Sequence, residues 1–370
     1  MEYRILGKTG LKISRMGFGG IPIQKIDEEG TRKLLHEMME KGVNYIDSAR
    51  GYTVSEQYIG YGLEGIRDKF VLATKSMSRT KEAMAADIET SLGNFRTDYI
   101  DLYQVHNPSM EQLDQVIGEG GALEALMEAK AAGKIGHIGL TAHSTAVFER
   151  ALGLDWVETI MFPYNIVEQQ GAELIHKCAE KNIGFIDMKP LAGGAIEDAT
   201  LALRYVCSNP DVTVVIPGMA EVRELEQNLA ACSNTEPLTD EELKAMDKVR
   251  EQLGTDFCRR CNLLRTMYRW NQHSKRIPVR RLPSEIRSRR LGKRPLQHTE
   301  SKSFRLHWLW QMRAKMPVSP ADPRETQEVR AGHGRINLFF TEENQGRYTN
   351  VQRYCKSKQK LQRLRRILSF

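Results

Sequence analysis

The chain of 370 residues contains no apolar run of about 18 residues, the length that a membrane-spanning helix requires. Its first residues, Met1–Arg4, lead into a strand-like segment and not into the apolar core of a signal peptide. We therefore expect a cytoplasmic protein with no membrane partner.

Cysteine is scarce as well, and six residues in the whole chain cannot build the dense disulfide framework of a small secreted domain. Cys178, Cys207 and Cys232 lie apart in helix-like or loop-like segments, which favours buried thiols over metal ligands. Cys258 and Cys261 differ from these, because they form a C-x-x-C pair.

Acidic side chains are nearly missing from the last part of the chain. Cys258–Phe370 holds 28 of the 54 lysines and arginines but only 7 of the 47 aspartates and glutamates. The first 257 residues carry the remaining 26 basic and 40 acidic side chains, so the formal net charge of +7 describes neither part. From Leu263 onward, apolar periodicity fails and Arg-rich sequence interrupted by proline offers no sustained face to bury. The sequence thus predicts a folded domain over residues 1–255 and a poorly ordered basic tail over 256–370.

What the first part does contain is a regular alternation of short β-branched runs with amphipathic helical segments, from Gly17 to about Asn228. Strands are predicted at Met16–Gly19, Asn44–Asp47, Phe70–Thr74, Ile100–His106, Lys134–Leu140, Thr159–Phe162, Gly184–Met188 and Thr213–Ile216. Eight such strand–helix units predict an α/β fold, and they suit a closed (β/α)8 TIM barrel better than an open sheet.

Helices are expected between the strands, for example at Asp27–Lys41, Lys81–Phe95, Met110–Ala132 and Ile196–Cys207. Ahead of the first strand, Tyr3–Ile13 reads as a hairpin that turns at Lys8–Gly10 and plugs the amino-terminal face of the barrel. After the last strand, Thr239 and Glu242 have the spacing of a capping box, which predicts a helix to about Leu253.

Polar residues stand at the ends of the second, third and fourth predicted strands and on the loop that follows the second. Asp47, Lys75 and His106 close the second, third and fourth strands, and Tyr52 follows on the loop after Asp47. Reacting groups of a barrel of this kind lie at the carboxyl ends of its strands. Each residue alone also has an ordinary structural interpretation. Asp47 could cap a helix, Tyr52 could be a half-buried loop aromatic, Lys75 a solvated strand terminus and His106 a core histidine. Their joint placement on consecutive strand ends favours a catalytic group.

The four residue types also suit one reaction, the reduction of a carbonyl. A tyrosine with a pKa near 10 is a poor acid–base group at neutral pH unless a cation lowers its pKa. Lys75 supplies that cation, Asp47 holds the lysine charged, and His106 orients the substrate oxygen.

These residues stand in longer stretches that are specific. The stretches are Gly17-Phe18-Gly19-Gly20, Tyr45-Ile46-Asp47-Ser48-Ala49-Arg50-Gly51-Tyr52 with Ser55-Glu56, Thr74-Lys75-Ser76, and Asp101-Leu102-Tyr103-Gln104-Val105-His106. Over about residues 1–250 the chain resembles the aldo-keto reductase family. The resemblance implies an enzyme that reduces an aldehyde, ketone or quinone by hydride transfer from NADPH or NADH. It maps the family's catalytic tetrad onto Asp47, Tyr52, Lys75 and His106, with Tyr52 as the general acid. The alternative is a non-enzymatic barrel that keeps the cofactor site and acts as a regulatory subunit.

The same resemblance implies where NADP or NAD would bind. The expected cofactor-binding residues are Gly19, Thr141, His143, Asn165, Met188, Pro190, Leu191, Gly193, Gly194, Pro217, Gly218, Met219, Glu224, Gln227 and Asn228. Glycines in the loop Pro190–Gly194 would let backbone N–H groups approach a pyrophosphate.

Some positions depart from the family pattern. Met188 stands where many members stack a tyrosine on the nicotinamide, and Met161 stands where they place a glutamine. Gly218 and Glu224 stand near places that often carry a lysine and an arginine for a 2′-phosphate. A glutamate repels that phosphate, which argues against a strict NADPH preference, although Arg223 can compensate.

The C-x-x-C pair resembles the opening of a ferredoxin-like segment that follows the barrel in one branch of this family. Leu264 and Met267 stand where the third and fourth ligands of a 4Fe–4S cluster are expected. A single-nucleotide slip after Asn262 explains this, since Met267 followed by a tyrosine codon rereads as cysteine, and Leu264 can do so too. Cys258 and Cys261 would then be vestigial ligands.

The shifted reading also restores a second run of ligands. The positions are Leu306, Leu309, Met312 and Met316, whose spacing after the slip is C-x2-C-x2-C-x3-C, that of a bacterial ferredoxin. We therefore expect residues from about 263 to be an out-of-frame translation of a two-cluster module, with clusters in the intact parent and not in this chain. The rival reading is a basic tail that binds nucleic acid, with Trp308 and Trp310 stacking on bases. Because it explains the charge alone, no nucleic-acid partner is expected.

Overall fold

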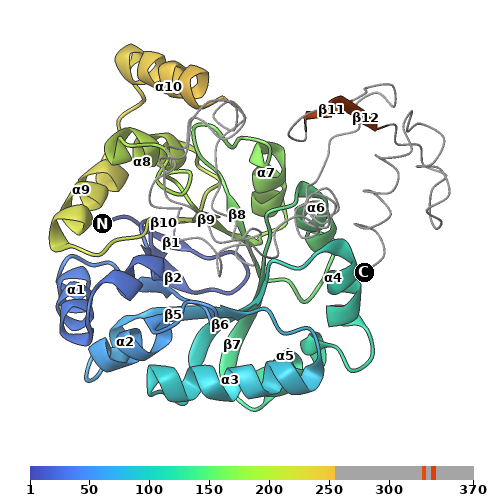
Figure 1. The fold of residues 1–370 in the computed structure, drawn as a ribbon. Helices are drawn as coiled ribbons and strands as arrows, with labels where there is room; N and C mark the ends of the chain where they lie inside the picture. The colour runs from blue at the N-terminus through green and yellow to red at the C-terminus, as the bar shows by residue number, and fades with distance from the viewer. Residues whose placement is uncertain (255–326, 331–334, 339–370) are drawn as a thin grey trace, which may run out of the picture. The chain divides into compact units, whose positions relative to one another are not determined.

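The computed structural model describes residues 1–254, 327–330 and 335–338 (Figure 1). The chain divides into two units, Met1–Arg287 and Ser288–Phe370. The described residues of the second unit are two antiparallel strands, β11 (Gln327–Arg330) and β12 (Arg335–Leu338). The predicted domain boundary near residue 256, both Cys258 and Cys261, and all of the predicted tail except β11 and β12 lie outside the described residues.

Eight parallel strands form the centre of the first unit. They are β3 (Phe18–Gly19), β4 (Tyr45–Asp47), β5 (Val71–Ser76), β6 (Ile100–His106), β7 (Ile135–Thr141), β8 (Thr159–Pro163), β9 (Gly184–Met188) and β10 (Val214–Ile216). Neighbours in the chain are neighbours in the sheet. The first and last strands also meet, through parallel bridges from Met16 to Val215 and from Gly19 to Gly218. The Gly19 N–H donates to the Pro217 carbonyl at 3.0 Å, so the predicted (β/α)8 barrel is confirmed.

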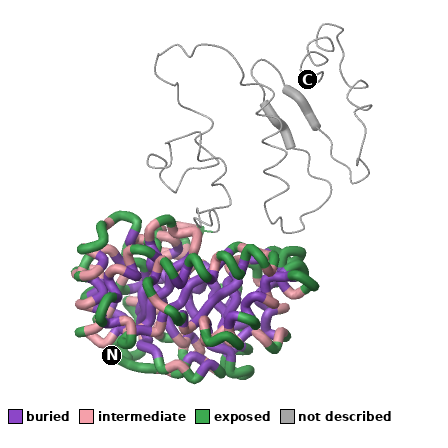
Figure 2. Tube along the Cα trace, turned by 90° about the horizontal axis from the view of Figure 1, so that it is seen from below, coloured by how far each residue is buried: buried purple, intermediate pink, exposed green. Residues whose placement is uncertain are grey.

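Helices surround this barrel, as Figure 1 shows. They are α1 (Glu28–Glu40), α2 (Ser55–Gly62), α3 (Lys81–Phe95), α4 (Met110–Ile117), α5 (Ala122–Ala131), α6 (Thr145–Ala151), α7 (Ala172–Glu180), α8 (Ala199–Ser208), α9 (Val222–Ser233) and α10 (Asp240–Leu253). Two 3₁₀ turns complete the described elements, η1 (Ile21–Lys25) and η2 (Arg67–Lys69). The tube in Figure 2 places the buried residues in the centre of this unit and the exposed ones on its outer turns and loops.

Successive strand residues alternate between the barrel interior and the layer beneath the helices, as the period of a β-strand requires. The inner layer groups Tyr45, Ala73, Leu102, Met161, Ile186, Val214 and Ile216. Their strand neighbours, such as Ile46, Leu72 and Tyr103, belong to the larger core between strands and helices. Because the alternation continues to each strand's end, residues two positions after an inner-layer residue face the barrel mouth.

The amino-terminal hairpin lies where the sequence predicted it. Strand β1 (Tyr3–Ile5) pairs antiparallel with β2 (Lys12–Ser14). Leu6 and Ile13 are fully buried and join the inner layer of the barrel, so the hairpin closes its amino-terminal end. Gly7 has φ +54°, and a Cβ there would lie 2.2 Å from the Gly184 nitrogen, so this approach requires glycine.

The predicted single helix over Met110–Ala132 is wrong. Helix α4 ends at Ile117 and α5 begins at Ala122. The intervening segment contains Gly120, whose φ is +68°, and Gly121, whose position leaves no room for a Cβ beside the Val116 carbonyl. Apolar residues at helical spacing stand on both sides of this break, Leu113 and Val116 before it and Ala122, Ala125 and Ala129 after it, which is why the sequence pattern concealed it. The capping box of Thr239 and Glu242 and the end of α10 at Leu253 are confirmed.

Candidate active site

Every residue that the sequence pattern placed at a strand end lies at the same end of the barrel, because all eight strands are parallel. Asp47 ends β4, Lys75 lies one residue before the end of β5, and His106 ends β6. Tyr52 lies on the loop that joins β4 to α2. The structure therefore brings the four expected catalytic residues to one mouth.

Lys75 is the centre of this group. Its ammonium donates to the Asp47 carboxylate through Oδ2 and to the Ser48 carbonyl at 2.7 Å. Both Lys75 and Asp47 are about 1–2% exposed, so the ion pair lies inside the protein. The ammonium also lies 4.8 Å from the centroid of the Tyr52 ring. The lysine thus contacts the carboxylate on one side and the phenol ring on the other.

Gln104 is a member of this cluster that the sequence analysis missed. Its side-chain amide donates to Asp47 Oδ1 at 3.1 Å, so the two carboxylate oxygens are held by different residues. Gln104 is fully buried. The signal that could have found it is its position two residues before His106 on the same strand, which places both on the inner face.

Tyr52 and His106 face each other across the mouth. Their ring centroids are 6.2 Å apart with an interplanar angle of 87°, an edge-to-face arrangement. A substrate oxygen placed between the phenol and the imidazole would meet a donor on each side. The geometry is that of a hydrogen-bonding site for a small polar group.

Burial and charge set the protonation states of this cluster. Burial lowers the pKa of Lys75, but the charges and hydrogen bonds of Asp47 and Tyr52 together outweigh it, so the pKa of Lys75 lies above its usual value. Burial raises the pKa of Asp47, opposed by the Lys75 charge and by the hydrogen bonds of Lys75 and Gln104. The lysine is therefore an ammonium whose charge remains inside the site.

The pKa of Tyr52 corrects a detail of the sequence argument. Burial raises this pKa above its usual value of 10, and the Lys75 charge lowers it by less. Tyr52 is thus protonated at neutral pH, which is the form that donates a proton. Burial, with the charges of Lys75, His143 and Arg79, lowers the pKa of His106 to about 2, so the imidazole is neutral.

A second buried network fixes the loop that carries Tyr52. The Glu56 carboxylate is 1% exposed and accepts from Arg50 at 2.6 Å, from Thr74 at 2.8 Å and from Ser91 at 2.9 Å. Thr74 precedes Lys75 on β5, so this carboxylate ties the Tyr52 loop to the strand that carries the lysine. Asp87 on α3 accepts from Arg50 as well, at 3.3 Å.

Left-handed backbone is concentrated at the same mouth. Of the six described non-glycine residues with positive φ, four, Thr53, Asn107, Lys189 and Ala192, lie on loops after β4, β6 and β9 with φ between 46° and 59°; the other two are Arg96 and Asn182. Thr53 follows Tyr52, Asn107 follows His106, and Lys189 follows Met188. Non-glycine residues in this region carry strain, and such strain gathers at functional sites.

The expected cofactor residues divide into two groups. Residues at the mouth are Gly19, Thr141, His143, Asn165, Met188, Pro190, Leu191, Gly193, Gly194, Pro217, Gly218 and Met219, on or after β3 and β7–β10. Residues on α9 are Glu224, Gln227 and Asn228. Gly193 and Gly194 have φ +69° and +88°, so the loop after β9 uses backbone that favours glycine. Met188 ends β9 and packs partly against the inner layer of the barrel.

Several of these side chains already have partners within the protein. Asn165 is fully buried, donates to Glu168 and to the Lys189 carbonyl, and accepts from two backbone N–H groups. The Met219 side chain is fully buried in the core. These two residues shape the mouth chiefly by fixing its loops.

The residues of α9 are also engaged. Glu224 accepts from the backbone N–H groups of Ala220 and Glu221, at 2.7 and 3.1 Å, as part of a capping box. Gln227 is exposed and donates to Thr200 at 3.4 Å, whereas Asn228 is 5% exposed. Two carboxylates, those of Glu221 and Glu224, thus stand at the amino terminus of α9.

Unpartnered polar atoms show that the mouth fits a nicotinamide cofactor and a polar substrate. The Nδ1 atom of His106 and both ring nitrogens of His143 are buried, and no group among the described residues hydrogen-bonds to them. Buried polar atoms are nearly always hydrogen-bonded, so each calls for a ligand with its own polar atoms. The carboxamide of a nicotinamide and the oxygen of a carbonyl compound have that chemistry.

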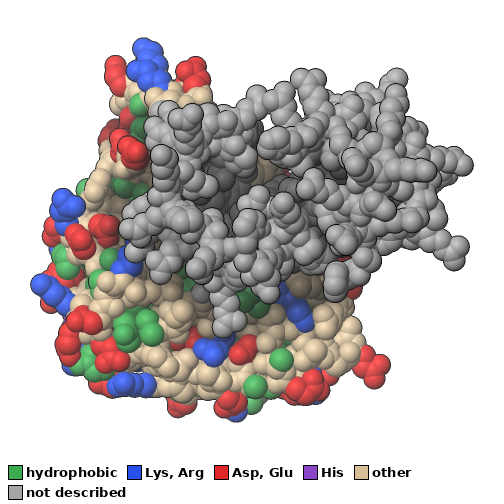
Figure 3. All heavy atoms as spheres, in the orientation of Figure 1, with side chains coloured by type: hydrophobic (Ala, Val, Ile, Leu, Met, Phe, Trp, Pro, Cys, Tyr) green, Lys and Arg blue, Asp and Glu red, His purple; other side chains and the backbone are tan. Residues whose placement is uncertain are grey.

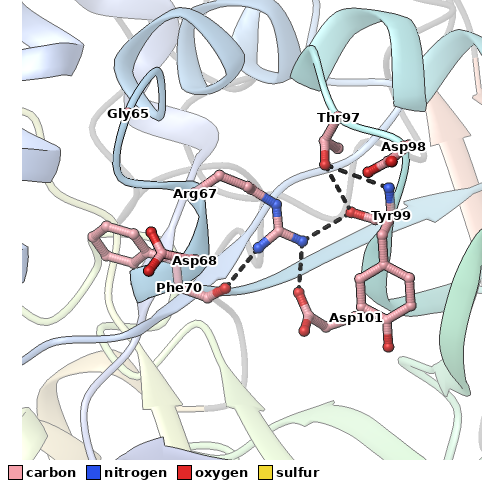
Figure 4. Close-up of a pocket in the computed structure, with 8 residues that line it drawn as sticks. All are labelled: Gly65, Arg67, Asp68, Phe70, Thr97, Asp98, Tyr99 and Asp101. Atoms are coloured by element: carbon pink, nitrogen blue, oxygen red, sulfur yellow. Dashed lines mark hydrogen bonds and ion pairs between the residues drawn. The ribbon is translucent and has the colours of Figure 1, made fainter.

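A hollow of about 550 Å³ lies away from this mouth (Figure 4). Its lining includes Arg67, Phe70, Tyr99 and Asp101, which precede or begin β5 and β6. Figure 4 shows the Arg67 guanidinium among the lining residues, where it donates to the Phe70 and Tyr99 carbonyls and to Asp101. Since the strands begin here, the hollow lies at the opposite end from Lys75 and His106.

Residues 1–254 and the short β11–β12 pair contain neither a membrane-spanning helix nor a cluster of metal-ligating side chains. No helix of these residues is long and apolar enough to span a membrane. No group of three or more His, Cys, Asp or Glu side chains in the same residues is arranged to hold a metal ion.

Comparison with known proteins gives one consistent result. The family model described as the aldo/keto reductase family matches residues 15–200 and 197–251. The chain is 27% identical over 289 residues to L-galactose dehydrogenase of Arabidopsis thaliana, covering 64% of this chain and 90% of that protein. It is 30% identical over 201 residues to the aldo-keto reductase YhdN of Bacillus subtilis, covering 49% and 59%.

A solved structure agrees. The holo form of an aldo-keto reductase from Bacillus halodurans is 26% identical, with a TM-score of 0.59, and the match covers 67% of this chain and 96% of that one.

Proposed function

Because the chain belongs to the aldo/keto reductase family and is an oxidoreductase, we propose that Tyr52 is the proton donor in its reduction of a carbonyl compound. Members of this family act with NADH or NADPH on small carbonyl compounds, here an aldehyde, ketone or quinone. The observation that supports the proposal is the Lys75 ammonium, buried against Asp47 and 4.8 Å from the Tyr52 ring.

Each side chain has a distinct task in this reaction. When bound, the nicotinamide supplies the hydride that the carbonyl carbon accepts. Tyr52 gives its phenolic proton to the carbonyl oxygen, which completes the alcohol. Lys75 stabilises the phenolate that remains, and Asp47 with Gln104 keeps the ammonium in place. His106, neutral at all physiological pH values, hydrogen-bonds the same oxygen and orients it.

The residues around the mouth support a cofactor position across β7–β10. Thr141, His143 and Met188 would contact the nicotinamide end, the loop Pro190–Gly194 the pyrophosphate, and Asn228 the adenine. A 2′-phosphate near α9 would face the carboxylates of Glu221 and Glu224, which already cap the helix. We therefore expect NADH to bind at least as tightly as NADPH.

Exposed apolar side chains at the mouth suit the carbon skeleton of a substrate. Ile21, Met77 and Met110 are 50%, 61% and 39% exposed, and they follow β3, β5 and β6. Large apolar side chains left exposed around a polar site favour a ligand that covers them.

The test combines cofactor titration with turnover. Protein fluorescence measured during titration with NADH and NADPH reports binding, and a panel of aldehydes and quinones with each cofactor reports reduction. Binding with turnover supports the enzyme. Binding without turnover of any member supports the non-enzymatic barrel, and binding of neither cofactor contradicts the proposed site.

For the tail, we propose that the residues after Asn262 are translated in a shifted reading frame. The intact parent protein would carry a module with two 4Fe–4S clusters in their place. This proposal is supported by the cysteine spacings that reappear in the shifted frame and by the abrupt change in charge at Cys258. Figure 3 shows acidic and basic side chains interspersed along the part of this face that the described residues form. Sequencing the gene tests the proposal, and an undisturbed frame whose codons cannot restore the cysteines contradicts it.

A further inference from the structure

Arg79 lies at the catalytic mouth, on the loop that joins β5 to α3. Its Nη2 donates to the main-chain carbonyl of His106 at 2.7 Å and contacts Gln112 Oε1 at 3.5 Å. Its Nη1 donates to the Ser78 carbonyl at 3.3 Å. The guanidinium therefore lies directly beside the strand end that carries the catalytic histidine.

This guanidinium lacks an acidic partner within residues 1–254. No carboxylate there forms an ion pair with it, whereas Arg50, Arg67, Arg150, Arg204 and Arg250 each have one. Its Nε atom is buried and has no hydrogen-bond partner in the part of the chain that the structure describes. Burial lowers the pKa of Arg79 to about 10, and no acidic group raises it, yet the side chain is still a cation at neutral pH. A partly buried, uncompensated charge of this kind is costly and is normally paired.

The surroundings of Arg79 are also basic. Lys75, Arg79 and Lys189 each act on His106 as nearby positive charges. Asp47, the acid of the tetrad, already receives Lys75 and Gln104. Because Asp47 is paired with Lys75, it does not offset the charge of Arg79, which therefore favours an incoming anion.

We propose that Arg79 binds a carboxylate of the substrate, so that the preferred substrate is an oxo acid with a short apolar link between its carbonyl and its acid group. This inference rests on the proposed carbonyl reduction. The unpartnered Nε–H can donate to a carboxylate oxygen, while Nη2 beside it already donates to the His106 carbonyl, and the guanidinium adds its positive charge. Ile21 and Met77 would contact the apolar link.

Arg79 also has a structural alternative, in which it only ties the β5 loop to the end of β6. That role would affect every substrate alike, because it acts through the position of His106. The measurement that separates the two is therefore a ratio, the kcat/KM of an acidic substrate divided by that of its neutral counterpart.

Two substrate pairs give this ratio for the full chain with NADH or NADPH. They are 4-oxobutanoate with butanal, and para-carboxybenzaldehyde with benzaldehyde. We expect the native protein to prefer the acid of each pair, and Arg79→Met to lower the ratio by about tenfold to a hundredfold, mainly through KM. Arg79→Lys keeps the charge but loses the Nε donor, so its ratio should fall between those of the native protein and Arg79→Met. The control Arg96→Met removes an exposed arginine paired with Glu64 near the start of β6 and should leave the ratio unchanged.

A binding measurement complements turnover. Calorimetric titration of benzoate and benzamide into the complex with oxidised cofactor should show tighter binding of benzoate, and Arg79→Met should abolish the difference. The role of Arg79 is overturned if Arg79→Met lowers kcat/KM equally for both members of a substrate pair. It is also overturned if the native protein shows no preference for the acid. Failure to reduce any of the four carbonyl compounds contradicts the proposed function instead.

Discussion

The Lys75 ammonium lies 4.8 Å from the centroid of the Tyr52 ring while its proton donors reach Asp47 and the Ser48 carbonyl. A cation fixed in this way stabilises a phenolate much better than a solvated one, because the low-polarity interior does not screen it. The arrangement explains how a tyrosine with a raised pKa can still release its proton during a reaction.

Tyr52→Phe removes the proton donor and keeps the ring. We expect kcat for aldehyde reduction to fall by about a hundredfold or more, with cofactor affinity nearly unchanged. Steady-state kinetics and fluorescence titration measure the two effects. Tyr61→Phe, which removes an exposed hydroxyl bonded to Glu29 on α1, is the matched control. Native-like turnover in the Tyr52 variant would reject this tyrosine as the acid.

Gln104→Met keeps the size of the side chain and removes one hydrogen bond to Asp47. As a positioning residue, Gln104 should affect kcat by about tenfold and leave KM nearly unchanged, because it acts through Asp47 and Lys75. Gln104→Glu tests the charge, since a second carboxylate beside Asp47 would compete for Lys75 and shift the pH profile of kcat. Two variants with unchanged kcat and pH profile would show that the amide only fills space.

Lys75→Met leaves the Asp47 carboxylate buried without its cation. Breaking a buried ion pair in this way costs about 3–5 kcal/mol, so the free energy of unfolding should fall by that order. Guanidinium chloride unfolding measures it. Lys69→Met, which breaks an exposed pair with Asp68, should change stability by less than about 1 kcal/mol. Similar losses in the two variants would mean that the buried pair is not ionised.

The buried histidines predict a loss of stability in acid. Burial lowers the pKa of His106 to about 2 and that of His143 to about 3, whereas both have an unfolded value near 6.5. The unfolded chain therefore binds more protons below pH 6.5, and stability falls as the pH decreases, by up to about 1.4 kcal/mol per pH unit for each ring.

Unfolding curves at pH 7, 6 and 5 measure this slope, and His143→Gln should flatten it. His176→Gln is the control of opposite sign, because Asp211 raises the pKa of this exposed histidine and its contribution is lost as the pH rises. An identical acid slope for the native protein and the His143 variant would show that this ring is not buried neutral.

From the cysteine content of the tail, we expect this chain to bind no iron–sulfur cluster. A 4Fe–4S cluster needs four thiolates, and beyond residue 257 this chain has only Cys258, Cys261 and the distant Cys355. Iron and sulfide analysis of protein purified without oxygen should therefore give far less than four of each per chain. Restoring the frame after Asn262 in the gene should give a brown protein with two clusters. Stoichiometric iron in the present chain would refute the proposal.

The sequence alone determined the barrel and its four catalytic candidates, because both follow from local pattern. Alternation of strand and helix, read from neighbouring residues, gave all eight strands within two residues at each end. The strand ends then located Asp47, Lys75 and His106, since parallel strands bring their carboxyl ends together. The sequence pattern failed once, because it predicted a single helix where Gly120 and Gly121 separate α4 from α5.

The tertiary structure alone decided which groups touch. The Gln104–Asp47 bond joins residues 57 positions apart, and the Arg79–His106 contact depends on how one loop lies over the next strand. The sign of the Tyr52 pKa shift was also beyond the sequence, since it is the balance between burial and one charge. Distances and burial of this kind arise from packing across the whole barrel, and no local window of sequence contains them.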